Sequence, residues 1–448
     1  MSRGGLRLGL LCAGWPPDVG GVESHAQDLA RELLARGHRV GVLCLDYGDG
    51  LEPYSTRERE LEGVRVRRMA YRYHDHGALA DVVRNPRSEE ALAAWVAETA
   101  PQLVHVHHLT GFGLGALERL ARMGTPTVMT LHDYWSLCPR GQMLHADGSL
   151  CARPEPDRCA ACLAGTWAHL MPSGTGRAEG PEDEPLGDDA AAAAARTAYA
   201  LERLRLPARR FTPSEAAREV YVRAGLDRDS IEVCPNGIEV GGLAEAVAAL
   251  RRPRDPGAVR LGVLGTVLPS KGVLELARAF AEAAVPGLQL EVHGNLPSYH
   301  GDGSYVAALR ELEGHSPDLR VLGPYSRDEL PAILAGLDGV AAPSRWEEVF
   351  GLTVREARAA GLPVLVSDAG DLPAVAGGGR AGLVVPRDDR AAWVAALRRF
   401  GTDAEARSRW AAAAVPVRTA ADMATQLERA YLEVVGRRLP WWRRLLGG

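Results

Sequence analysis

Lysine occurs once in this chain of 448 residues, at Lys271, and the other 51 of its 52 basic side chains are arginine. A skew of this size indicates coding bias. At a solvated surface position arginine replaces lysine at little cost, but a site that needs a compact ammonium group does not tolerate the exchange. The retained lysine therefore marks position 271 as a candidate site, with survival by chance as the alternative.

The densest group of reactive side chains lies in residues 343–357, PSRWEEVFGLTVREA. The string ends a predicted strand and opens a predicted helix, with Glu348 on the loop and Glu356 one turn into the helix. Open α/β sheets bind ligands at the carboxyl ends of their strands, so both carboxylates are expected to face such a crevice. A loop carboxylate can bind hydroxyls, and a helix N-terminus can bind phosphate. For Glu356 taken alone, a solvated helix charge is the alternative.

A glycine pair, Gly20-Gly21, follows the first predicted strand and begins a helix. Backbone N–H groups and the helix dipole favour an anion there, although a turn needed only for backbone geometry is the alternative. The turn is not G-x-G-x-x-G and lacks the acidic residue expected about 20 positions later, so a dehydrogenase is not indicated.

Four of the seven cysteines, Cys138, Cys151, Cys159 and Cys162, are spaced C-x12-C-x7-C-x2-C. Four thiolates with a terminal C-x-x-C suit a tetrahedral structural zinc, and a loop of low apolar content could be ordered by such an ion. His145 is an alternative ligand. Unliganded thiols, an iron–sulfur cluster and disulfides remain open, with disulfides disfavoured in a cytoplasmic protein.

Two series of alternating strands and helices must position these residues. Apolar runs such as 6–12, 39–45 and 103–106 alternate with amphipathic stretches such as 22–36. The pattern restarts at 259–265 after LRRPRDPG at 250–257, which reads as a linker. Alternating strands and helices predict parallel sheets, so the sequence indicates two doubly wound halves of similar size.

Composition excludes several classes of protein. With 46% hydrophobic and 24% charged residues the chain is ordinary for a globular protein, and no run of about 18 apolar residues predicts a spanning helix. The apolar stretch at 6–13 reads as a buried strand rather than a signal core, so a cytoplasmic location is expected. The net charge of −5 argues against nucleic acid as a partner. The tail WWRR at 441–444 suits peripheral contact with the inner face of the membrane, or packing on the fold.

The string at 343–357 resembles the E-x7-E signature of retaining GT-B glycosyltransferases, in particular the large family-4 group. Four further motifs follow the order of that family. Residues 16–40 resemble its glycine loop and first helix, and Leu131–Trp135 resembles its histidine motif. Residues 265–272, GTVLPSKG, resemble its G-R-x-x-x-x-K-G donor loop, and PNGI at 235–238 resembles its P-N-G-[IV]. The resemblance implies a GT-B fold, in which two Rossmann-like domains face a cleft.

The resemblance also assigns roles to particular residues. Lys271 would neutralise the diphosphate leaving group, Glu348 would hold hydroxyls of the transferred sugar, and Glu356 would bind the ribose. His132 would approach the donor sugar and the acceptor. Further donor contacts would come from the residues Gly20, Gly21, Phe350 and Gly351.

One position departs from the family pattern. The family usually has arginine where this chain has Thr266 in the donor loop. The second cation beside the diphosphate is then missing or is supplied by another residue, such as Arg345. More of the charge compensation would fall on Lys271.

The expected activity is transfer of a hexosyl group, with retention, from a UDP- or GDP-sugar to a saccharide or lipid-linked acceptor in bacterial cell-surface polysaccharide or glycoconjugate synthesis. No cofactor is expected for catalysis. The expected domains are 1–250, with a cysteine-rich loop at 138–162 and an acidic loop at 174–189, then 258–415, then a helix crossing back within 416–448. A non-catalytic sugar-nucleotide-binding protein and a GT-B epimerase are the alternatives. A phosphorylase is disfavoured, because its pyridoxal would need a second lysine.

Overall fold

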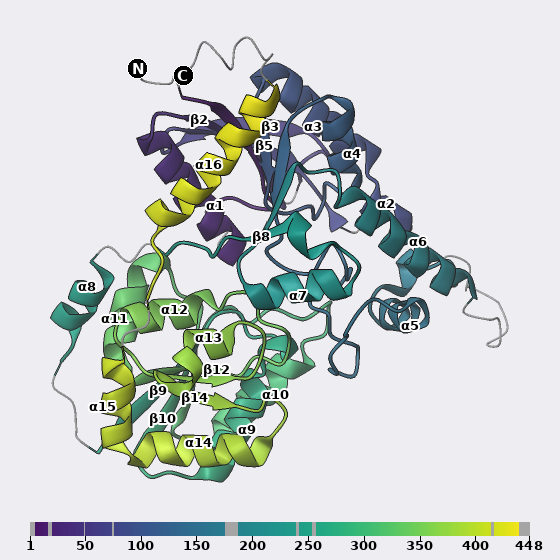
Figure 1. The fold of residues 1–448 in the computed structure, drawn as a ribbon. Coiled ribbons are helices and arrows are strands. Elements are labelled where there is room, and N and C mark those ends of the chain that lie inside the picture. The colour runs from purple at the N-terminus through teal and green to yellow at the C-terminus, as the bar shows by residue number, and fades with distance from the viewer. Residues whose placement is uncertain are drawn as a thin grey trace. The chain divides into compact units, whose positions relative to one another are not determined.

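The computed structural model describes residues 5–16, 20–48, 50–73, 76–174, 187–238, 242–252, 257–413 and 416–438. The chain divides into two compact units: unit 1 comprises residues 1–237 and 420–448, and unit 2 comprises residues 238–419. Figure 1 shows the elements of both units. The tail at 441–444 and most of the predicted acidic loop at 174–189 lie outside the described residues.

Unit 1 is built on one eight-stranded sheet in the order β3-β4-β2-β1-β5-β6-β7-β8. Its strands are β1 Arg7–Leu11, β2 Arg39–Asp46, β3 Thr56–Leu61, β4 Val64–Ala70, β5 Leu103–Val106, β6 Thr127–Thr130, β7 Arg209–Thr212 and β8 Ile231–Val233. Its α-helices are α1 Gly21–Ala35, α2 Leu79–Val83, α3 Pro86–Thr99, α4 Gly115–Arg122, α5 Pro156–Trp167, α6 Gly187–Arg203, α7 Glu215–Arg223 and α16 Ala420–Arg438. Central strands β1 and β5 are buried and apolar because helices cover both faces of a parallel sheet.

Unit 2 repeats this architecture with six parallel strands in the order β11-β10-β9-β12-β13-β14. Its strands are β9 Val259–Leu264, β10 Leu288–His293, β11 Leu319–Gly323, β12 Gly339–Ala342, β13 Val364–Ser367 and β14 Gly382–Val385. Its α-helices are α8 Leu243–Leu250, α9 Val273–Ala283, α10 Ser304–His315, α11 Leu330–Gly336, α12 Leu352–Ala359, α13 Leu372–Val375, α14 Arg390–Thr402 and α15 Ala404–Ala412. The two sheets confirm the predicted pair of Rossmann-like α/β halves.

The edge strand β3 is an element that the apolar pattern did not predict. Its sequence TREREL is exposed almost throughout, and it pairs antiparallel with β4. Glu58 accepts hydrogen bonds from Arg65 and Arg67 of β4, so cross-strand charge pairs replace apolar burial. A charged edge also discourages pairing with other chains.

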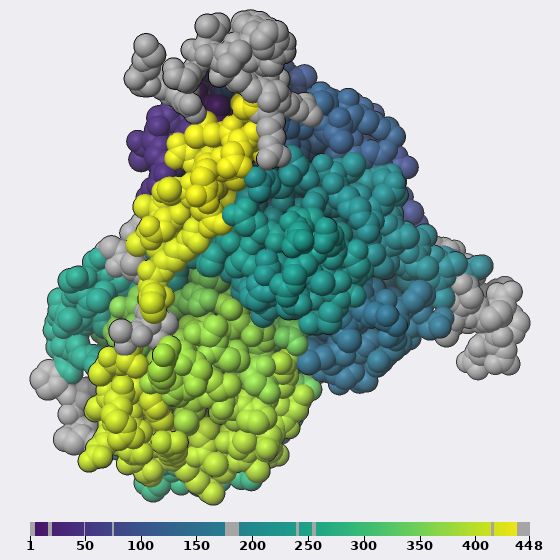
Figure 2. All heavy atoms as spheres, viewed as in Figure 1, coloured from purple at the N-terminus to yellow at the C-terminus, as the bar shows by residue number. Residues whose placement is uncertain are grey.

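The last helix, α16, belongs to unit 1 and packs along α1. Met423, Leu427 and Tyr431 of α16 join Leu29 and Leu33 of α1 in one apolar cluster. Figure 1 shows the two helices side by side, and Figure 2 shows the outer face of α16 at the surface of unit 1.

The division between the units falls between Gly237 and Ile238, ahead of the predicted linker at 250–257. Helix α8 packs on α11 of unit 2, and the Arg251 guanidinium donates to the Leu337 carbonyl at 3.4 Å. Asp189, assigned to a solvated loop from the sequence, is buried in the first turn of α6 and accepts hydrogen bonds from Ser173. Among the described residues, no helix combines the length and the apolar character needed to cross a membrane.

Candidate active site

The donor loop of unit 2 runs from the end of β9 to the start of α9. A single 3-10 turn, Pro269–Lys271, presents the lysine, and Gly272 follows with φ +66°. A Cβ at Gly272 would lie 2.1 Å from the Pro343 carbonyl oxygen, so only glycine allows the two loops to approach. The Arg345 N–H donates to the Ser270 carbonyl at 2.8 Å and joins the loops from the other side.

Lys271 and Glu348 form an ion pair between these two loops. The Lys271 ammonium donates to both carboxylate oxygens of Glu348, at 3.0 and 2.8 Å. Glu348 also accepts from the Ser344 hydroxyl at 2.7 Å and from the Trp346 indole N–H at 3.0 Å. Burial alone would raise the pKa of Glu348, but the lysine and the two other donors lower it. The structure thus brings together two residues that the sequence placed 77 positions apart, and holds the buried carboxylate ionised.

The second glutamate, Glu356, lies one turn into α12, which begins after Gly351 with φ +67°. Glu356 is partly buried; burial raises the pKa of Tyr325, and the Glu356 charge raises it further. The two glutamates of residues 343–357 therefore have different neighbours: Glu348 binds Lys271, whereas Glu356 lies near Tyr325. Phe350 is buried under the Arg355 guanidinium, 4.0 Å from its ring centre.

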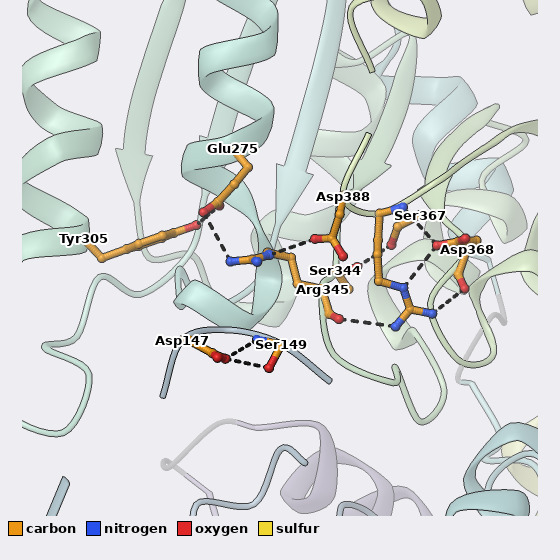
Figure 3. A network of polar contacts seen from close by, with 10 residues as sticks. Asp147, Ser149, Glu275, Tyr305, Ser344, Arg345, Ser367, Asp368 and Asp388 are labelled. Carbon is orange, nitrogen blue, oxygen red and sulfur yellow. Dashed lines mark hydrogen bonds and ion pairs between the residues drawn. The ribbon is translucent and has the colours of Figure 1, made fainter. Parts of the chain in front are cut away.

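Arg345, the predicted substitute for the missing donor-loop arginine, is engaged by two carboxylates. Its guanidinium lies 3.7 Å from Glu275 and 3.4 Å from Asp388, and Glu275 also accepts from the Tyr305 hydroxyl at 2.7 Å (Figure 3). Its positive charge is therefore largely compensated. Thr266 stands in the segment between Gly265, which has φ +116°, and the 3-10 turn.

The glycine pair of unit 1 begins α1, as predicted. Gly20 has φ −146°, which any residue adopts, and a Cβ added there would meet only the end of the flexible Glu23 side chain. A Cβ added at Gly21 would meet nothing within 4 Å. Backbone conformation therefore does not require glycine at either position.

His132 follows β6 and lies in a cluster with two histidines that the sequence reading missed. His107 follows β5 and His25 lies in α1, and both are buried. The His107 and His132 rings are stacked with centroids 5.4 Å apart, and their Nδ1 and Nε2 atoms lie 3.2 Å apart. Burial, together with the neighbouring imidazoles, lowers the pKa of His107 and His132 well below the ordinary value. Burial also lowers the pKa of His25 to about 3, against a smaller opposing effect of Asn236.

Two more histidines of the segment HVHH after residue 104 have defined partners. Buried His105 hydrogen-bonds to the Tyr431 hydroxyl at 2.5 Å and the Thr130 hydroxyl at 2.8 Å. His108 bonds to Asp133 at 3.0 Å; burial lowers its pKa, but Asp133 more than offsets this, so the pKa is raised. Histidines at the ends of two adjacent parallel strands were the signal that could have revealed the cluster.

The four clustered cysteines lie in the segment between β6 and α6. Cys159 and Cys162 share one face of α5, and all four thiols are close enough to act on one another electrostatically. Burial and the three other thiols raise the pKa of Cys151 to about 12. His145 places Nδ1 at 3.7 Å from the Cys162 sulfur. Among the described residues, however, only His25, His107 and His132 bring three ligand atoms within 4.8 Å of one another.

Buried Arg196 of α6 holds the start of this cysteine segment. Its guanidinium donates to the carbonyls of Trp135, at 2.5 Å, and Leu137, at 2.9 Å. Burial lowers the pKa of Arg196 to about 10, and the nearby Cys138 and Cys159 oppose that shift. The segment is thus tied to the fold by one buried cation.

Comparison with known proteins gives two matches to protein families and many similar structures. Residues 19–241 match the family described as Glycosyltransferase Family 4, and residues 252–415 match Glycosyl transferases group 1. The chain is 26% identical over 430 residues to a D-inositol 3-phosphate glycosyltransferase of Nocardioides sp., covering 89% of this chain and 81% of that protein. It is also 26% identical over 414 residues to the phosphatidyl-myo-inositol mannosyltransferase of Mycolicibacterium smegmatis, covering 91% and 88%.

A shorter match is more similar in sequence. The D-inositol 3-phosphate glycosyltransferase of Stackebrandtia nassauensis is 34% identical over 202 residues, which span 42% of this chain and 45% of that protein. Among solved structures, sucrose-phosphate synthase from Thermosynechococcus elongatus has a TM-score of 0.64 at 18% identity, covering 96% of this chain and 99% of that one. Anabaena HepE in complex with UDP and glucose has a TM-score of 0.62 at 17% identity, with the same coverage. The fold is therefore GT-B, and the chain belongs to the family-4 glycosyltransferases, those also described as glycosyl transferases group 1.

Proposed function

We propose that this glycosyltransferase moves a hexosyl group, with retention, from a UDP- or GDP-sugar to a saccharide or lipid-linked acceptor. The observation that carries the proposal is the ion pair between Lys271, the single lysine, and the buried carboxylate Glu348. A strongly hydrated ammonium held beside an ionised carboxylate suits a donor with a charged diphosphate and a hydroxylated sugar.

In the proposed reaction, the bond between the anomeric carbon and the diphosphate oxygen breaks as the acceptor oxygen attacks from the same face. The acceptor proton passes to the leaving diphosphate. Lys271 neutralises the charge that grows on the diphosphate, and backbone N–H groups of Phe350 and Gly351 assist. Glu348 accepts hydrogen bonds from sugar hydroxyls, and Glu356 accepts from the ribose.

Unit 1 supplies the acceptor side in this proposal. His132 positions the donor sugar and the acceptor hydroxyl, and its lowered pKa keeps it neutral at pH 7. A neutral imidazole can accept a hydrogen bond from a hydroxyl without competing for the diphosphate charge. The N–H groups at Gly20 and Gly21 would add anion contacts.

The relatives suggest which acceptors to test first. Two of them carry D-inositol 3-phosphate or phosphatidyl-myo-inositol in their names. We therefore include inositol phosphates and phosphatidylinositol beside saccharide and polyprenyl-linked acceptors. A role in cell-surface polysaccharide or glycoconjugate synthesis on the cytoplasmic side of the membrane follows if a lipid-linked acceptor is used.

Two measurements test the proposal. A panel of UDP- and GDP-sugars is screened for thermal stabilisation, and the stabilising donor is then incubated with each acceptor. The anomeric configuration of the product is read by NMR. An α-linked product from an α-linked donor is expected; a β-linked product would exclude retention. Slow release of the nucleoside diphosphate without acceptor separates an enzyme from a binding protein, and conversion of the donor to its epimeric sugar nucleotide would identify an epimerase.

We also propose that Cys138, Cys151, Cys159 and Cys162 bind a structural zinc, with His145 as the alternative fourth ligand. The support is their spacing and their convergence on one segment, next to the compensating charge of Arg196. Zinc binding would require the four sulfur atoms to move to the distances of a tetrahedral site. The zinc content of the protein should fall by one equivalent per chain in Cys159→Ser/Cys162→Ser and stay unchanged in Cys44→Ala. Protein with neither zinc nor iron would dismiss the proposal.

The tail at 441–444 is proposed to contact the membrane peripherally. Tandem tryptophans beside arginines suit the interface of anionic lipids. The full chain should sediment with vesicles containing anionic lipid, and Trp441→Ala/Trp442→Ala should lower the bound fraction. An unchanged bound fraction would count against this contact.

A further inference from the structure

Three histidines of unit 1, His25, His107 and His132, form a buried cluster. Positioning of a hydroxyl by His132 would not by itself require the other two imidazoles. His25 comes from α1, His107 from the end of β5 and His132 from the end of β6. The His25 ring lies 4.5 Å from that of His132 and 5.2 Å from that of His107, centroid to centroid. One nitrogen from each of the three rings lies within 4.8 Å of the others.

The cluster also contains buried polar atoms without a hydrogen-bond partner. Both ring nitrogens of His25, Nε2 of His107 and Oδ1 of the neighbouring Asn236 have none. A buried polar atom left unpaired destabilises the fold, so several together call for a ligand that would satisfy them. The remaining pair, His107 Nδ1 and His132 Nε2, lies 3.2 Å apart.

The distance between His107 Nδ1 and His132 Nε2 matches that between two ligand atoms on one metal ion. Two imidazole nitrogens bound to one tetrahedral zinc at 2.0–2.1 Å lie about 3.3 Å apart. Three neutral imidazoles are the donor set of open zinc sites, which keep a fourth position for water or substrate. Burial keeps all three rings unprotonated at neutral pH, which is the form that binds metal.

We propose that His25, His107 and His132 form a binding site for one borderline divalent cation such as Zn²⁺, Co²⁺ or Ni²⁺. Mg²⁺ and Ca²⁺ are excluded by the donor set, because hard cations need oxygen ligands. The site differs from the cysteine cluster in its ligands. Asp133 and Glu23, which act electrostatically on the adjacent His108, would offset part of the added positive charge.

Under the proposed function, on which this step rests, a cation bound at this site should also affect sugar transfer. His132 cannot position a hydroxyl through a nitrogen that binds a metal. The bound cation should therefore inhibit the enzyme at concentrations near its dissociation constant. Micromolar Zn²⁺ should lower turnover, EDTA should restore it, and Mg²⁺ should have no effect.

The test of the site itself is a titration of the chelator-treated full-length chain with Co²⁺. A cobalt ion bound by imidazoles gives visible d–d absorption without the near-ultraviolet charge-transfer band of a cobalt–thiolate site. The Cys159→Ser/Cys162→Ser background removes the thiolate signal. In that background, one equivalent of Co²⁺ with d–d absorption is expected, displaced by Zn²⁺.

His25→Leu is the decisive variant, because neither ring nitrogen of His25 has a hydrogen bond of good geometry and leucine suits its buried position. It should weaken Co²⁺ binding about tenfold or more. His76→Gln is the control: His76 is a buried histidine of unit 1 that bonds to the Tyr71 hydroxyl, and its loss should leave Co²⁺ affinity unchanged. A His25→Leu protein that melts like the parent and binds Co²⁺ equally well would overturn the proposal, as would a parent that binds none. Binding without inhibition would support the site and count against the role of His132.

Discussion

The two units carry reactive groups of opposite electrostatic character. In unit 2 the buried carboxylate of Glu348 is paired with the partly exposed ammonium of Lys271, which helps to lower the pKa of Glu348. In unit 1 the imidazoles of His25, His107 and His132 are buried together and remain neutral. The same physical penalty, loss of hydration, acts in both units. The outcome differs because Glu348 has a partner of opposite charge at hydrogen-bonding distance, whereas these three imidazoles have one another as ring neighbours.

Under the proposed function, this difference corresponds to different roles for the two units. Charge that changes during a reaction is best met by fixed opposite charge, as unit 2 provides. A hydroxyl that must be positioned is better met by neutral acceptors, as unit 1 provides. Each experiment below addresses the reactive groups of one unit against those of the other.

The largest effect is expected from Lys271→Arg. Arginine keeps the charge but replaces the compact ammonium, which binds both Glu348 oxygens and lies 5.1 Å from the centre of the Trp346 ring, with a wider planar group. We expect turnover to fall by about 10²–10³-fold, the usual cost of losing one group that stabilises transition-state charge. Steady-state kinetics with the identified donor measures it.

The melting temperature and circular dichroism of Lys271→Arg should match those of the parent, because the lysine side chain is about one-third exposed. Parent-like turnover in this variant would remove the diphosphate role from Lys271 and with it the main support of the proposed function.

A smaller loss is expected from His132→Ala, in metal-free protein. The variant removes one neutral positioning group, so turnover should fall by roughly 10–10²-fold, with little change in donor affinity. Donor affinity by calorimetry and turnover by product assay separate the two effects. A loss of donor affinity equal to the loss of turnover would place His132 in ground-state binding instead.

Acid should destabilise unit 1 before unit 2. His25, His105, His107 and His132 have lowered pKa values in the fold, so below about pH 6.5 the unfolded chain binds protons that the folded chain does not. The free energy of unfolding of unit 1 should therefore decrease as the pH is lowered, by up to about 1.4 kcal/mol per pH unit for each histidine.

Unit 2 has a different window. The lowered pKa of Glu348 stabilises the fold above the unfolded value of about 4.3, and that contribution is lost only as the pH falls below it. Burial raises the pKa of Asp371 to about 6, which makes the folded form bind a proton first and opposes any loss between pH 6 and 4. Hydrogen exchange at pH 7.5 and 5.5, corrected for intrinsic rates, should show loss of protection in unit 1 alone. Equal loss in both units would contradict the assignment of charge states.

The smallest effect is expected from Arg345→Ala. Because Glu275 and Asp388 already compensate its charge, turnover and donor affinity should change by less than about threefold. A loss comparable with that of Lys271→Arg would show that Arg345 leaves these partners to bind the diphosphate, as the sequence had suggested.

Much of this organisation could be read from the sequence. Buried parallel strands produce apolar runs, and the amphipathic helices between them have a different period, so β1, β5 and β9 and helix α1 could be placed within a few residues. Elements without an apolar pattern were missed. Strand β3 is one of these, because charge pairs across to β4 stabilise it. Helix α14 was missed as well, although Trp393, Val394, Leu397 and Phe400 form a regular apolar face.

The sequence by itself determined the two Rossmann-like halves and the family resemblance, and it singled out Lys271, Glu348 and His132 as candidate site residues, because motif order and residue type can be read from the linear sequence. Only the tertiary structure decided which groups meet. It paired Lys271 with Glu348 across 77 positions, engaged Arg345 with two carboxylates, and gathered His25, His107 and His132 from three separate elements. Such contacts depend on strand order and on the close approach that Gly272 allows. The charge states follow in turn from burial, which no single position in a sequence specifies.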